Sequence, residues 1–123
     1  MAVDRDELAT SEVALIAMAT ESWRLARLFS RSLEKLDANE ANRYASQLRY
    51  FQKKLGNILE SAGFTLVNIE GSPYDSGAAV NAINLADFEP DDVLLIEQMI
   101  EPIIMGPDGL MKEGAVLLRK LHR

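Results

Sequence analysis

One apolar stripe in the middle of the chain constrains the fold more than any other feature of the sequence. Apolar side chains recur there at alternating steps of three and four, at Ala41, Tyr44, Leu48, Phe51, Leu55, Ile58 and Ala62. Such alternation is the heptad spacing of a helix that packs lengthwise against another helix. We therefore expect a long helix here, with a narrow packing seam along one side.

A second amphipathic helix is expected before this one. Its stripe also runs at steps of three and four and consists of Leu15, Ala19, Trp23, Ala26, Phe29, Leu33 and Leu36. No proline interrupts residues 1–72, so nothing in the sequence breaks either helix. The two helices are expected to be joined by a short turn at residues 36–39.

The helix starts have local signals. Asp4 with Glu7, and Asp37 with Glu40, have the spacing of capping boxes, in which a side chain accepts a hydrogen bond from a free backbone N–H at the helix start. Residues 10–11, a threonine and a serine, offer an alternative start for the first helix.

Two antiparallel helices with one seam each cannot bury both seams well on their own. Pairing with a second copy in a four-helix bundle would bury them, and this is the arrangement we expect. The alternative is that the second half of the chain covers the helices. The expected dimer interface consists of Trp23, Tyr44, Leu48, Phe51, Leu55 and Ile58.

The character of the sequence changes after Gly63, which is placed to end the second helix in a left-handed conformation. Residues 64–69 predict a strand, and residues 71–77 are rich in turn formers. Residues 93–105 fit either a helix, with Pro90 near its start, or a strand. A turn at residues 106–109 predicts a β-hairpin, whose second arm is expected at 110–118 with a bulge at Gly114.

These elements predict an α+β fold, with a helical dimerisation region at residues 1–63 and a small acidic β domain at residues 64–123. The second region holds ten Asp and Glu against four Lys and Arg. This charge disfavours nucleic acid and anionic membranes and favours a protein partner with a basic or neutral face. The longest apolar run, residues 13–19, is too short to span a membrane, and a cytoplasmic location is expected.

Residue types that carry catalysis are scarce. The chain has no cysteine, and its one histidine, His122, is next to the last residue. We therefore expect no catalytic residue, no cofactor and no metal, and we expect that the protein is not an enzyme. The carboxylates at residues 87–92 leave one enzymatic alternative, a carboxylate-based or metal-dependent hydrolase, but they lack the spacing of a calcium loop. From the residues alone, 99–105 is either an apolar contact edge or core.

The arrangement of elements resembles that of the GrpE family of nucleotide exchange factors, the dimeric cochaperones of DnaK-class heat-shock ATPases. The resemblance lies in the helix 40–63 that ends at a glycine, the Pro-Tyr-Asp turn at 73–75, the apolar strand 93–98, and a closing hairpin with Gly109 and residues 114–116. It covers residues 40–120 and consists of the order and spacing of elements.

The resemblance implies a dimeric bundle, a strand at residues 93–105, and a β domain that binds the nucleotide-binding domain of the ATPase and promotes ADP release. It also implies that this chain lacks the family's long N-terminal stalk. The contact face that it implies consists of Pro73, Tyr74, Asp75, Gln98, Met99, Pro102, Met105 and Gly109.

The chain departs from the family pattern at Ser76-Gly77, at Pro107-Asp108 and at Glu113. These departures support a second hypothesis, a non-catalytic adaptor or scaffold that keeps the fold without the exchange activity.

Overall fold

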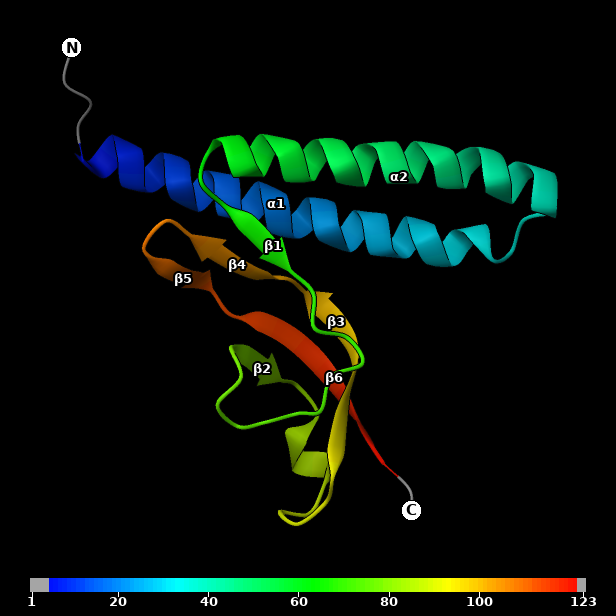
Figure 1. Ribbon diagram of the computed structural model, residues 1–123, viewed down its shortest axis with the longest axis vertical. Coiled ribbons are helices and arrows are strands. Elements are labelled where there is room, and N and C mark those ends of the chain that lie inside the picture. The colour runs from blue at the N-terminus through cyan, green and yellow to red at the C-terminus, as the bar shows by residue number, and fades with distance from the viewer. Residues whose placement is uncertain (1–4, 122–123) are drawn as a thin grey trace. The chain divides into compact units, whose positions relative to one another are not determined.

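The computed structural model describes residues 5–121 and shows an α+β protein. Two helices come first and two three-stranded sheets follow (Figure 1). The chain divides into two compact units between Ala62 and Gly63, one residue before the expected boundary. We call the first the helical unit and the second the β unit.

The helical unit is a hairpin of α1 (Arg5–Leu33) and α2 (Ala38–Ser61). The start of α2 is the predicted one, because the Asp37 side chain accepts a hydrogen bond of 3.0 Å from the backbone N–H of Glu40. Residues 10–11 lie inside α1, so the alternative start is wrong, and the Asp4 cap lies outside the described residues. Neither helix, over the part of the chain described, has the length and apolar character of a membrane span.

The β unit contains two small sheets. The first has the order β1-β4-β5, is antiparallel throughout, and is formed by Thr65–Val67, Ile103–Gly106 and Gly109–Lys112. The second has the order β2-β6-β3 and is formed by Val80–Ala82, Gly114–Lys120 and Leu94–Glu101. In this sheet β2 runs parallel to β6 and β3 runs antiparallel to it. A single 3-10 turn, η1 (Leu85–Asp87), precedes β3.

Residues 93–105 form strands rather than a helix, and Pro102 divides them between the two sheets. Proline has no N–H to give to a strand ladder, so β3 ends before it and β4 begins after it. The hairpin expected at residues 106–109 is confirmed, with Gly106 opposite Gly109 and a φ of +121° at Gly109. Its second arm is shorter than expected, because β5 ends at Lys112 and β6 joins the other sheet.

Gly114 begins β6 and does not form the expected bulge. A Cβ there would lie 2.8 Å from the Met99 Cε and 3.0 Å from the carbonyl oxygen of Glu101, so the strands approach too closely for a side chain. The buried core of the β unit is built from both sheets and includes Leu94, Ile96, Met99, Ile103, Ile104, Val116 and Leu118.

The chain leaves α2 through a glycine, as predicted. Gly63 has a φ of +86°, which is the left-handed conformation expected after the end of α2.

Asn84 continues the edge of the second sheet beyond β2. Its amide donates to the carbonyl of Leu118 at 3.0 Å and accepts from the Leu118 N–H at 2.9 Å, so it fixes the start of η1 against β6.

Candidate protein-interaction site

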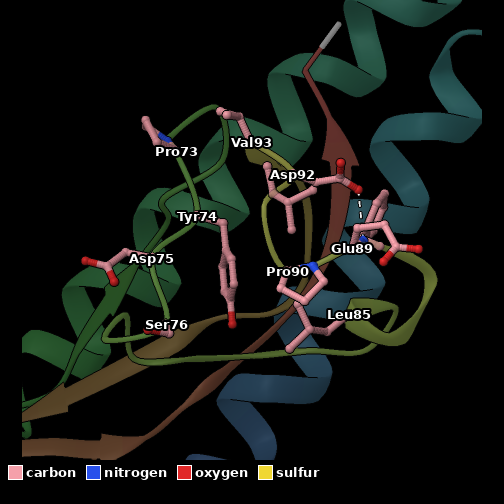
Figure 2. Close-up of a pocket in the computed structure, with 11 residues that line it drawn as sticks. Pro73, Tyr74, Asp75, Ser76, Leu85, Glu89, Pro90, Asp92 and Val93 are labelled. Atoms are coloured by element: carbon pink, nitrogen blue, oxygen red, sulfur yellow. Dashed lines mark hydrogen bonds between the residues drawn. The ribbon is translucent and has the colours of Figure 1, made fainter.

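The surface of the β unit contains a cavity of about 670 Å³. It lies between the turn at residues 73–76 and the segment 85–94, which are brought together only by the fold (Figure 2). We call it the acidic pocket. Its lining residues are Pro73, Tyr74, Asp75, Ser76, Leu85, Phe88, Glu89, Pro90, Asp92, Val93 and Leu94.

The first wall is held against β3 by its backbone. The N–H of Tyr74 donates to the carbonyl of Leu94 at 2.9 Å, and Pro73 forms an antiparallel bridge with Leu95. The Asp75 carboxylate accepts from the N–H of Gly77 at 3.0 Å, which closes the turn locally. In Figure 2 the Tyr74 ring extends from this turn beside Pro90, while the Asp75 carboxylate points away from the ring.

The opposite wall contains a tight turn at residues 89–92. The N–H of Asp92 donates to the carbonyl of Glu89 at 3.1 Å, and the Asp92 carboxylate accepts from the N–H of Glu89 at 2.9 Å (Figure 2). Pro90 therefore occupies the second position of a turn, where its fixed φ is favourable, and does not begin a helix.

Asp92 also forms an ion pair of 3.1 Å with Lys120. The hydrogen bond from the backbone of Glu89, followed by the interaction with Lys120, lowers the pKa of the Asp92 carboxyl below its ordinary value. This carboxylate therefore stays ionised and holds the turn to the last residues of β6.

The pocket is apolar at its walls and negative at its rim. Three carboxylates line it, and two more lie in the same segment, at Asp87 and Asp91. Residues 63–111 contain no lysine or arginine, so Lys120 is the cation paired with this segment. Among residues 5–121, no three side chains of the metal-binding kinds converge on one point.

The other residues of the expected contact face are divided. Gln98 is half-buried in β3, whereas Met105 and Gly109 lie at the β4–β5 hairpin. This hairpin and the acidic segment lie at opposite ends of the β unit (Figure 1). The structure thus gathers Pro73, Tyr74 and Asp75 in one pocket and places Met105 and Gly109 at a separate site.

Met99 and Pro102 belong to the core, which corrects their place in the expected contact face. Both side chains are almost fully buried. The Met99 sulfur accepts a hydrogen bond from the N–H of Ile69 at 3.1 Å, and the backbone N–H of Met99 donates one to the Glu70 carboxylate at 2.8 Å. Since neither side chain reaches the surface, neither can contact a partner directly.

The helical unit has an apolar face of its own. Tyr44, Phe51 and Ile58 lie along the predicted seam of α2 and remain exposed, at 41%, 41% and 52%. Beside them is a groove of about 280 Å³ between the helices, lined by Leu25, Ala26, Phe29, Gln47, Leu48 and Phe51. Phe29 meets Tyr44 edge-to-face, with ring centroids 6.3 Å apart.

Three further residues of the expected dimer interface are more enclosed within the chain. Leu48 is buried, and Leu55 and Trp23 are half-buried. The Trp23 indole N–H is buried and finds no acceptor among residues 5–121, while Arg27 lies over its ring at 5.8 Å.

Sequence reasoning missed parts of both surfaces. It did not identify Leu85, Phe88 and Val93 as walls of a pocket, although apolar residues within an acidic run are a usable signal. On α1 it missed Met18 and Leu25, which are about two-thirds exposed and lie outside the stripe that the spacing picked out.

Comparison of the chain with family models, with curated proteins and with solved structures finds no match. A functional assignment therefore rests on the order of the elements and on three surfaces, which are the acidic pocket, the β4–β5 hairpin and the apolar face of the helices.

Proposed function

We propose that the chain is a GrpE-like cochaperone that binds the nucleotide-binding domain of a DnaK-class ATPase and promotes ADP release. The observation that carries this proposal is the order of elements from α2 through the β unit. A helix ends at a left-handed glycine, a short strand follows, a Pro-Tyr-Asp turn lies on β3, and a glycine hairpin precedes β6. This is the order on which the resemblance to the family rests.

Such a factor needs no covalent chemistry. It acts by binding the open, nucleotide-free form of the ATPase more tightly than the closed form, which shifts the ATPase toward the open form. Linkage makes the effect reciprocal, so nucleotide binding to the ATPase must weaken its affinity for the factor. The exposed turn at residues 73–76 and the β4–β5 hairpin are the surfaces of the β unit that would make these contacts.

We further propose that the active form is a homodimer joined through the helices. Exposed Leu25 and Phe51, together with the apolar groove between them, support this arrangement. Large exposed side chains along both helices of a hairpin are costly in water unless another surface covers them. A second copy presents the same face and would complete a four-helix bundle.

The proposal is tested by ADP release from a purified DnaK-class ATPase loaded with a fluorescent ADP analogue. Addition of the chain should accelerate release and should lower the equilibrium affinity of the ATPase for ADP by between about 5-fold and 150-fold, the range of ordinary coupling free energies. Excess ATP should then separate the two proteins. Absence of acceleration, with or without binding, would refute the exchange proposal and leave the adaptor hypothesis, whose partner need not be a DnaK-class ATPase.

A further inference from the structure

We propose that the acidic pocket receives an arginine side chain from the surface of a partner protein. This inference rests on the proposed function, because it names the chemistry by which the β unit would recognise its ATPase. It concerns the residues around Tyr74 and Glu89, which belong to different segments of the chain.

The walls of the pocket suit the stem and the plane of a guanidinium group. Tyr74, Phe88 and Pro90 supply aromatic and proline surfaces, and Leu85 and Val93 remain about half exposed. Aromatic faces attract cations through their quadrupole, and arginine also stacks on them. An exposed apolar pocket of this size gains from any ligand that covers it, so the charge of the rim decides which ligand is favoured.

The rim favours a cation. Three carboxylates line the pocket, those of Asp75, Glu89 and Asp92, and that of Asp92 is paired with Lys120. Residues 63–111 contain no lysine or arginine. The Glu89 carboxylate is exposed. Phosphate and carboxylate ligands would be repelled by this arrangement, whereas a basic side chain is drawn to it.

The cation is expected to be organic rather than a metal ion. The carboxylates are spread around the rim, and no three of them converge among residues 5–121. Arginine is favoured over lysine because its guanidinium is planar and more weakly hydrated, so it can leave water and lie against Tyr74.

The direct test is an NMR titration of the full-length, isotope-labelled protein. The probes are arginine, lysine and citrulline, each blocked at both ends, and citrulline has nearly the shape of arginine without its charge. Blocked arginine should shift the amide signals of Tyr74, Phe88 and Glu89 with a Kd on the order of millimolar. Citrulline should bind about tenfold more weakly, because it loses both the cation–π and the ionic contributions.

A matched pair of variants locates the effect. Glu89→Gln removes one negative charge from the rim, and Glu97→Gln removes one from an exposed position in β3 outside the pocket lining. Glu89→Gln should weaken arginine binding at least about threefold, whereas Glu97→Gln should leave it unchanged. Equal weakening by both variants, or equal shifts with arginine and citrulline, would overturn the proposal.

The arginine titration and the ADP-release assay together separate this inference from the proposed function. If the chain accelerates ADP release but arginine does not bind in the pocket, the inference fails and the exchange activity stands. If arginine binds in the pocket but no DnaK-class ATPase responds, the pocket chemistry stands and the exchange function fails. If both hold, Glu89→Gln should weaken ATPase binding and Glu97→Gln should not.

Discussion

At the scale of single residues, the structure predicts opposite effects on stability when two glycines are each replaced by alanine. Gly114 begins β6, where a Cβ would lie 3.0 Å from the backbone oxygen of Glu101 and 2.8 Å from Met99. A backbone oxygen cannot rotate away as a side chain can, so we expect Gly114→Ala to destabilise the β unit by about 1–3 kcal/mol. Gly56 lies inside α2 with nothing within 4 Å of a built Cβ, so Gly56→Ala should stabilise the helical unit by about 1 kcal/mol.

Urea unfolding can follow both effects, because the units carry different probes. Trp23, the single tryptophan, reports on the helical unit, and NMR signals from buried methyl groups such as those of Ile104 and Val116 report on the β unit. A neutral Gly114→Ala would mean that β6 and the end of β3 can separate at little cost. A destabilising Gly56→Ala would mean that another surface approaches α2 at this position.

At the residue scale, the sequence was informative where the signal was local. The Asp37 cap and the left-handed Gly63 each depend on a few neighbouring residues, and both are present as expected. The burial of Met99 and Pro102 could not be read locally, since it depends on which strands from distant parts of the chain pack over them.

At the scale of elements, the turn at residues 89–92 should make the stability of the β unit sensitive to acid. Its contacts lower the pKa of Asp92 below 3.8 in the folded protein. The ionised carboxylate therefore contributes stability that is fully present above this ordinary value and is lost as the pH falls through the lowered pKa. Asp92→Asn should reduce the loss of unfolding free energy that occurs as the pH falls below about 4.

A second variant tests the cause of this effect. The backbone hydrogen bond from Glu89 is the largest single cause of the lowered pKa, and Lys120 adds a hydrogen bond and its charge. Lys120→Gln should therefore remove only part of the acid sensitivity that Asp92→Asn removes. If Lys120→Gln removes as much as Asp92→Asn, the ion pair rather than the turn controls the acid response.

The elements show why periodicity alone left residues 93–105 undecided. A short run of Ile, Leu and Val fits a buried strand as well as a helix, and the outcome depends on partners elsewhere in the chain. Here β6 pairs with β3, and β1 and β5 pair with β4. The expected second arm at 110–118 is divided between β5 and β6, which belong to different sheets. The local spacing of apolar residues does not show where a chain passes from one sheet to another.

At the scale of the whole molecule, the candidate sites differed in how far they could be predicted. The α+β order follows from two helical stripes and the strand and turn signals after them, and the predicted seam of α2 follows from spacing along one helix. The acidic pocket joins Tyr74 to a segment that begins eleven residues later, and only the pairing of residues 73–74 with β3 brings the two walls together. Unlike the spacing along a helix, the pairing between strands cannot be predicted from any single segment of the sequence.

The last prediction concerns assembly. If two copies bury the apolar face of the helices, the helical unit gains stability by mass action, and its unfolding midpoint must rise with protein concentration. Trp23 fluorescence should show this rise, while the buried methyl signals of the β unit should change much less. Phe51→Asp should abolish the concentration dependence and yield monomers by light scattering, because it places an unpaired charge in the buried face.

Tyr50→Asp is the matched control. Tyr50 is the neighbouring aromatic residue on α2, is 66% exposed and lies outside the seam. Its substitution replaces an aromatic side chain by the same negative charge as Phe51→Asp does, but outside the proposed interface. It should leave the dimer intact. Dissociation by both variants would show that charge on α2, rather than the seam, controls assembly. A wild-type chain that stays monomeric at every concentration would leave Phe51 and Leu25 exposed in the working protein, and the exchange proposal would then have to hold for a single β unit.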